Sequence, residues 1–126
     1  MALASYSARK TPSPEEREII DFLLQDRVHL EPRACNDLKH SRYYNVGVDD
    51  PGFRNLAGIF SDKIFDAFHQ FAKSRMRKGM PLLIAGGCGL NCDWNTRWKE
   101  SGLFAEVFVP PVANDSCRYS DLPLGL

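Results

Sequence analysis

The clearest pattern of apolar and polar positions lies between residues 55 and 78. Apolar side chains recur there at steps of three and four residues, the spacing of one helix face; they are Leu56, Ile59, Phe60, Ile64, Phe68, Phe71 and Ala72. The basic run from Lys73 to Lys78 suits a helix C-terminus, and Gly79 is a natural cap. The pattern therefore predicts a helix over residues 55–78. The basic run fits a solvated helix end better than a phosphate contact.

A shorter apolar pattern follows Ser13. This serine offers an N-cap hydroxyl, Pro14 takes the first helical position, and Glu16 completes a capping box. The apolar side of the helix consists of Ile19, Ile20, Leu23 and Leu24. The helix is predicted to fade near Gln25.

Two further stretches of the N-terminal half lack a sustained period. Residues 1–12 are expected to be disordered. Residues 26–54 carry scattered prolines and glycines and are expected to form a long irregular connection with one short strand at most. Such a long loop usually has a function or faces a partner surface.

The period changes after the long helix. Residues 80–85 are a short continuous apolar run, as in a strand covered on both faces. Gly86 and Gly87 end it, and a second helix is predicted from about Asn91 to Glu100, with Trp94 and Trp98 on one face.

A second strand is predicted at residues 105–109, closed by Pro110 and Pro111. The order helix, strand, helix, strand predicts an α/β fold whose two strands are parallel.

Composition and charge narrow the classes of function. The chain has 126 residues, 44% of them hydrophobic, which fits one domain or part of one. Sixteen basic residues balance sixteen acidic ones, so no net charge favours nucleic acid or a membrane. No apolar run approaches the ~18 residues of a membrane span, and the N-terminus lacks a signal-peptide core. We therefore expect a cytoplasmic protein that binds neither nucleic acid nor membrane.

The cysteines allow a weak metal hypothesis. Without a secretory signal, a disulfide framework is not expected. Cys88 and Cys92 could share a helix face and, with a histidine or cysteine of residues 29–40, form a zinc site, but the spacing matches no compact ligand pattern. Buried or incidental thiols are the favoured interpretation.

A strand that ends in glycines and opens a helix can hold a phosphate or a nucleotide. Without Cβ atoms the backbone of Gly86 and Gly87 can approach a ligand closely, and a helix N-terminus favours an anion. The glycines alone fit a tight strand-to-helix turn equally well. They match neither the P-loop nor the dinucleotide fingerprint.

A longer motif covers residues 80–116. It contains LLIAGGCGLNCDWNTRWKESGLFAEVFVPPVANDS, which resembles the carbamoyltransferases that modify antibiotics and nodulation factors. The shared elements are Gly-Gly-x-x-x-Asn after a strand, Gly-Leu-Phe, Pro-Pro and Asn-Asp-Ser. Here they are Gly86, Gly87 and Asn91; Gly102, Leu103 and Phe104; Pro110 and Pro111; and Asn114, Asp115 and Ser116.

The resemblance implies a domain of the actin-like ATPase (ribonuclease H-like) fold, related to the tRNA threonylcarbamoylation protein. It implies that another domain makes carbamoyl-adenylate from carbamoyl phosphate and ATP, and that the carbamoyl group passes to a hydroxyl of a small natural product. Carried over, Gly86, Gly87 and Asn91 contact the nucleotide. Asp115 would bind iron or another divalent metal beside two histidines of a His-x-x-x-His motif.

The sequence also departs from the family. It has no His-x-x-x-His, because its histidines stand at positions 29, 40 and 69. The N-terminal half of the actin-like fold and the adenylate-forming domain are not recognised, and residues 117–126 leave the family pattern. We expect residues 13–116 to be a partial carbamoyltransferase domain, an incomplete fragment from a truncated or shifted reading frame, inactive without the remainder of the enzyme.

Two alternatives stay open on the sequence alone. The chain could be a non-catalytic nucleotide-binding or packing module, or part of another actin-like enzyme such as a sugar kinase. The Pro-Pro and Asn-Asp-Ser elements argue against the kinase.

Overall fold

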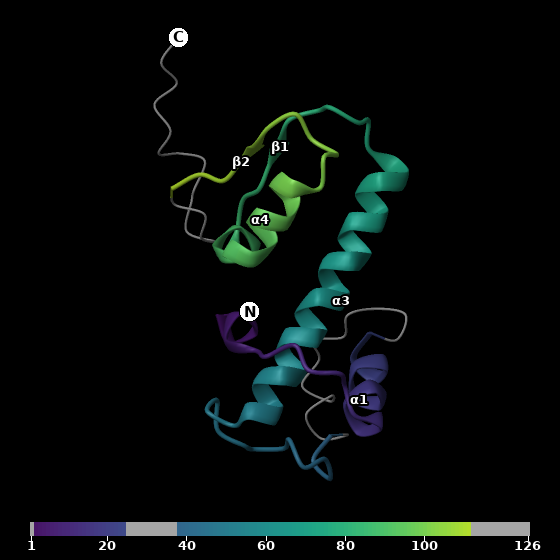
Figure 1. Cartoon of the computed structure of the whole chain (residues 1–126), viewed down its shortest axis with the longest axis vertical. Helices are drawn as coiled ribbons and strands as arrows, with labels where there is room; N and C mark the ends of the chain where they lie inside the picture. The colour runs from purple at the N-terminus through teal and green to yellow at the C-terminus, as the bar shows by residue number, and fades with distance from the viewer. Residues whose placement is uncertain (1, 25–37, 112–126) are drawn as a thin grey trace. The chain divides into compact units, whose positions relative to one another are not determined.

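A computed structural model describes residues 2–24 and 38–111 of the chain (Figure 1). The chain divides into two units, Met1–Ile64 and Phe65–Leu126. Helix α3 (Pro51–Arg75) contributes its first part to one unit and its last part to the other.

The first unit contains the 3-10 helix η1 (Ala2–Tyr6), helix α1 (Pro14–Leu24) and the start of α3. Its core consists of Ile19, Ile20, Tyr43 and Leu56, with partly buried apolar side chains around them. The predicted capping box is confirmed: the Ser13 N–H donates to Glu16 Oε2 over 2.6 Å, and the Glu16 N–H donates to Ser13 Oγ over 3.2 Å.

Helix α3 is displaced from its predicted bounds, since it begins at Pro51 and ends at Arg75. The reason for the early start is local: Asp50 Oδ1 accepts a hydrogen bond of 2.7 Å from the Phe53 N–H, and proline is favoured at the first helical position. Gly79 does not cap the helix directly. Its φ of 81° turns the chain toward the next strand.

The described part of the N-terminus differs from the expected disorder of residues 1–12. Residues Ala2–Tyr6 form η1, and Ala4 within it is only 2% exposed. Arg9 donates hydrogen bonds to the Ala4 carbonyl and to Asp62, the latter over 2.9 Å. The Lys10 N–H donates to Asn55 Oδ1 over 2.8 Å. These contacts join residues distant in sequence, which is why local composition did not predict them.

The expected irregular connection lies partly outside the described residues, which resume at Leu38. Residues 38–50 form turns, and no strand occurs in that described stretch. Tyr43 enters the core from this segment and is 8% exposed.

The second unit confirms the predicted parallel pairing. Strands β1 (Leu82–Leu83) and β2 (Val107–Phe108) are parallel, with Leu82 opposite Val107 and Leu83 opposite Phe108. Helix α4 (Cys92–Glu100) connects them and packs against β2. It ends where predicted, since Gly102 has a φ of 65°. The strands are shorter than the apolar runs that predicted them, because a two-stranded sheet gives each strand a single partner.

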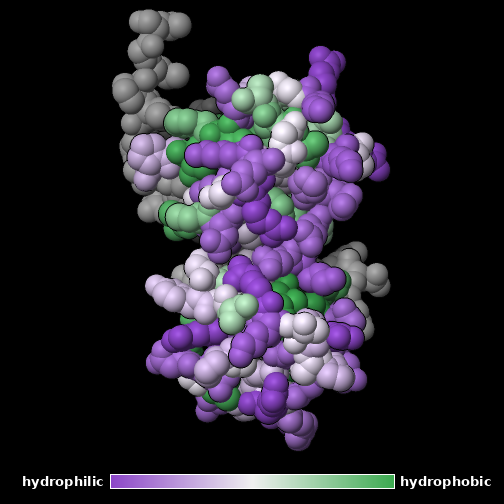
Figure 2. All heavy atoms as spheres, in the orientation of Figure 1, coloured by the Kyte–Doolittle hydropathy of each residue, from purple (hydrophilic) through white to green (hydrophobic). Residues whose placement is uncertain are grey.

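Aromatic side chains form the core of the second unit. Trp94 and Trp98 share a face of α4, and their ring centroids lie 5.9 Å and 4.8 Å from that of Phe65. Leu83 and Phe108, on the other face of the sheet, are 66% and 59% exposed. Figure 2 shows such hydrophobic residues at the surface among hydrophilic ones.

The architecture is thus a set of helices with a small parallel sheet, consistent with part of a larger α/β domain. Within the described residues, no helix combines the length and the apolar character that crossing a membrane requires.

Candidate nucleotide turn

The turn after β1 is built around Gly86. Its φ of 80° and ψ of −174° lie in a region that is essentially restricted to glycine. The chain then forms the 3-10 helix η2 (Gly87–Leu90), in which the Gly89 N–H donates to the Gly86 carbonyl over 2.9 Å. Gly87 is not among the glycines of positive φ. Gly86 is therefore required by the backbone itself, whereas Gly87 is not.

Asn91 joins this turn to α4. Its side-chain Oδ1 accepts a hydrogen bond of 3.2 Å from the Trp94 N–H and so caps the helix. Asn91 is 7% exposed. Asn91, which the family resemblance assigns to nucleotide contact, thus also stabilises the start of α4.

Asn95 is a residue of the turn that the sequence analysis missed. Its Nδ2 donates to the Gly89 carbonyl over 2.8 Å, which fastens η2 to the first turns of α4. Its Oδ1 is buried and has no hydrogen-bond partner among residues 2–24 and 38–111, an arrangement that costs stability. The sequence offered one signal: an asparagine four residues after Asn91, which places both on one helix face.

The structure therefore brings together the three predicted nucleotide contacts, Gly86, Gly87 and Asn91, in one strand–turn–helix segment. A helix N-terminus carries partial positive charge, which favours an anion, although Asp93 in the first turn of α4 opposes this. Gly87 itself has no Cβ, which allows a phosphate a closer approach to the backbone than another residue would.

Asp115, the predicted metal ligand, lies outside the described residues, as do His29 and Cys35. Cys88 and Cys92 are exposed free thiols, which fits incidental cysteines and not buried ones. In the described ranges no group of three or more histidine, cysteine, aspartate or glutamate side chains could hold a metal.

The first unit holds a separate polar cluster that the sequence did not predict. Glu16 Oε1 accepts hydrogen bonds of 2.9 Å from the Tyr43 hydroxyl and 3.5 Å from Asn55 Nδ2. Glu16, Tyr43 and Asn55 are all buried. Arg42 completes the cluster by donating to the Tyr43 hydroxyl.

This cluster shifts the titration of its members. Burial alone would raise the pKa of Glu16, but hydrogen bonds from Ser13, Tyr43 and Asn55 together outweigh it and lower the pKa. Burial raises the pKa of Tyr43, and Glu16 adds to that effect while Arg42 opposes it. Because the members satisfy one another, the cluster fastens residues 10–16 to α3. Two hollows adjoin it, one of about 190 Å³ beside Tyr43 and one of about 310 Å³ beside Glu16 and Asn55.

Comparisons with known proteins cover residues of both units. The sequence profile of the family described as Carbamoyltransferase N-terminus matches residues 58–118. The 3'-hydroxymethylcephem-O-carbamoyltransferase of Streptomyces clavuligerus is 38% identical over 117 residues, which cover 92% of this chain and 22% of that protein. The protein of the same name from Amycolatopsis lactamdurans is 37% identical over 117 residues, with the same coverage of both chains.

Nodulation protein U of Rhizobium tropici is 41% identical over 103 residues, which cover 67% of this chain and 18% of that protein. The chain thus spans about a fifth of the length of the curated relatives that it matches. No solved structure matches it.

Proposed function

The chain belongs to the carbamoyltransferase family, and from this premise we propose that it is part of an enzyme that carbamoylates a hydroxyl of a small natural product. The carbamoyl donor in this proposal is carbamoyl-adenylate, made from carbamoyl phosphate and ATP. The names of the cephem relatives, which describe O-carbamoylation of a hydroxymethyl compound, support a hydroxyl acceptor.

In the proposed reaction the acceptor oxygen attacks the carbamoyl carbon. The bond from that carbon to the adenylate phosphate oxygen breaks, AMP leaves with the electron pair, and the hydroxyl proton is lost. The segment from Gly86 to Asn91 would hold the nucleotide part of the donor. The observation that carries this assignment is the turn itself: Gly86, in a glycine-only conformation, follows the parallel strand β1 after two residues, and η2 and then α4 begin after it.

A metal takes no step in this proposal. The described residues supply no group that fits one, and the sequence contains no His-x-x-x-His. Asp115 remains a proposed ligand of the complete enzyme on the family resemblance alone, because a carboxylate is a suitable oxygen ligand.

One observation favours a second candidate, a non-catalytic packing module. Asn91 caps α4 and Asn95 holds Gly89, so the turn is stabilised from within the protein. In that case the glycines would serve only the change of direction from strand to helix.

Replacement of Gly87 by valine distinguishes the two candidates. In a full-length carbamoyltransferase carrying this segment, Gly87→Val places a branched side chain where the nucleotide must approach. We expect ATP affinity to fall about tenfold or more in calorimetric titration, since loss of close approach costs at least ~1.4 kcal/mol. The fold should survive, because Gly87 does not have a positive φ.

Gly47→Val is the matched control. Gly47 is exposed, and an added Cβ would meet only the Asp49 nitrogen at 4.0 Å. This variant should bind ATP as the parent protein does. A folded Gly87→Val protein with undiminished ATP affinity would show that the glycines serve the turn alone.

A further inference from the structure

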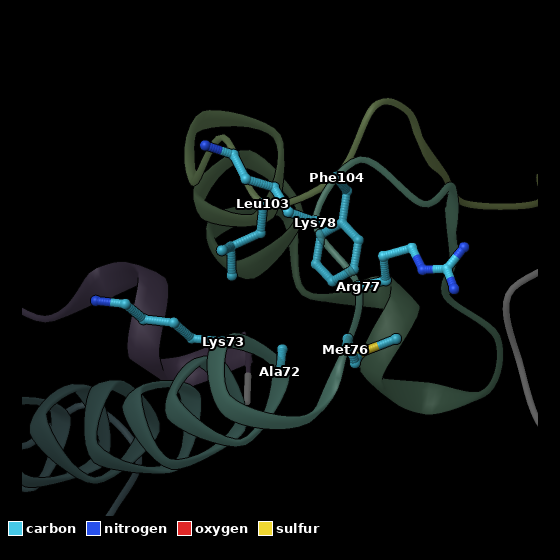
Figure 3. A pocket seen from close by; sticks show the side chains of 7 residues that line it. All are labelled: Ala72, Lys73, Met76, Arg77, Lys78, Leu103 and Phe104. Carbon is cyan, nitrogen blue, oxygen red and sulfur yellow. The ribbon is translucent and has the colours of Figure 1, made fainter.

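A hollow of about 250 Å³ lies in the second unit, between the C-terminal end of α3 and the segment that follows α4 (Figure 3). Four apolar side chains line it: Ala72, Met76, Leu103 and Phe104. Three cationic side chains complete the lining: Lys73, Arg77 and Lys78.

The hollow is formed by contacts that the chain makes with itself. The Gly79 N–H donates to the Leu103 carbonyl over 2.8 Å, and the Ala105 N–H donates to the Met80 carbonyl over 3.2 Å. The Phe104 ring lies 5.6 Å from the Trp98 ring, centroid to centroid. The apolar residues are therefore held in place before any partner binds, which lowers the entropy cost of binding.

The cations of the hollow have no salt bridge to any residue within the described ranges. Figure 3 shows the ammonium groups of Lys73 and Lys78 on the same side as Leu103, and the guanidinium of Arg77 on the other side of Phe104. Positive charge thus flanks the apolar floor on two sides. Met76 is 39% exposed, which leaves apolar surface open to solvent.

We propose that this hollow docks an acidic polypeptide segment, which inserts one apolar side chain between flanking carboxylates. A volume of about 250 Å³ suits a single side chain better than a whole cofactor. A small anion would reach the cations of one side and leave the floor unused, whereas a purely apolar ligand would leave the cations without a partner. A central apolar anchor within a charged rim is the usual arrangement of protein interfaces.

This surface is separate from the nucleotide turn. The lining residues lie before the start of each strand, Lys78 before β1 and Phe104 before β2, whereas Gly86 and Gly87 follow the end of β1. The proposal is therefore independent of ATP binding and can be tested without it.

The test is a titration of the isotopically labelled 126-residue chain followed by NMR. The probe is the blocked peptide acetyl-Glu-Asp-Leu-Asp-Glu-amide at millimolar concentration. We expect chemical-shift changes at Met76, Leu103 and Phe104. Replacing the central leucine of the peptide by serine should weaken binding about tenfold, because the apolar contact is lost.

Substitutions in the chain test the charges. The double variant Lys73→Gln, Lys78→Gln should weaken binding about fivefold, as expected for exposed ion pairs. The single variant Lys73→Gln should show part of this effect. Arg75→Gln is its matched control, since it likewise removes one charge from the last turn of α3 but does not line the hollow. It should leave the affinity unchanged.

Four results would overturn the proposal. Equal weakening by Arg75→Gln, or equal binding of the serine peptide, would show nonspecific charge attraction. The absence of shifts at the hollow at millimolar peptide would show that no such segment docks there. Tighter binding of a short thymidine oligonucleotide at the same residues would assign the surface to nucleic acid instead.

Discussion

Gly86 and Gly87 are neighbours in the sequence, yet the structure constrains them differently. Gly86 adopts a backbone conformation that residues other than glycine rarely adopt, whereas Gly87 begins η2 without a positive φ. A functional test therefore belongs at Gly87, because a substitution at Gly86 would disturb the backbone before it reported on a ligand.

The single residue Glu16 makes the stability of the protein depend on pH. Its pKa is lowered in the folded protein, so its contribution to stability is present above the unfolded value of about 4.3 and is lost as the pH falls through the folded pKa. Glu16→Gln should lower the free energy of unfolding of the first unit by about 1–3 kcal/mol at pH 7, since it weakens a buried hydrogen-bond network. The loss should become smaller below about pH 4.

Urea denaturation at pH 7 and at low pH measures this difference. Glu15→Gln is the control, because Glu15 is half-exposed and pairs with exposed Arg42 over 3.2 Å. Its effect should stay within about 1 kcal/mol. A constant difference between the parent and Glu16→Gln at all pH values would contradict the titration of Glu16.

At the scale of elements, helix starts depend on single capping residues. α3 begins at Pro51 because Asp50 accepts the Phe53 N–H, although Pro51 and Gly52 first indicate a loop. α4 begins after Asn91 in the same way. The bounds of both helices therefore follow side-chain acceptors more closely than the apolar period.

Asp50→Ala should destabilise the first unit by about 1 kcal/mol, because the N-terminal amides of α3 lose their acceptor. Asp49→Ala is the neighbouring control. Asp49 is exposed and forms a surface salt bridge with Arg54, whose loss should cost less than about 0.5 kcal/mol. Equilibrium unfolding followed by circular dichroism measures both. Equal effects of the two substitutions would mean that Asp50 does not act as a cap.

At the scale of the whole molecule, membership of a family of enzymes does not imply that this chain alone is active. The family profile matches residues 58–118, which include the turn, while the chain spans about a fifth of its curated relatives. The described ranges contain no group of three or more histidine, cysteine, aspartate or glutamate side chains that could hold a metal.

We therefore predict that the purified 126-residue chain contains no stoichiometric iron and shows no turnover with carbamoyl phosphate, ATP and a hydroxyl acceptor. The physical reason is that one carboxylate, Asp115, rarely holds a metal without further ligands. Elemental analysis and product detection measure this. One tightly bound iron per chain, lost in Asp115→Asn, would contradict the prediction and reveal ligands outside the motif considered.

The sequence alone determined the elements of local origin. The capping box at Ser13, the helix end at Gly102 and the parallel order of the two strands all follow from residues close together in the chain, or from the chirality of the crossover. The place of Trp94 and Trp98 on one face of α4 is likewise predicted by helical spacing, and both rings lie against Phe65.

Only the tertiary structure decided the contacts between distant residues. The hydrogen bond of Tyr43 to Glu16, the anchoring of Lys10 by Asn55 and the hollow between α3 and Leu103 have no local signature. The sequence likewise does not show which of the two glycines, Gly86 or Gly87, adopts the positive φ; in the structure it is Gly86. Such contacts depend on which surfaces meet when apolar faces are buried, and that choice is made by the whole fold and not by neighbouring residues.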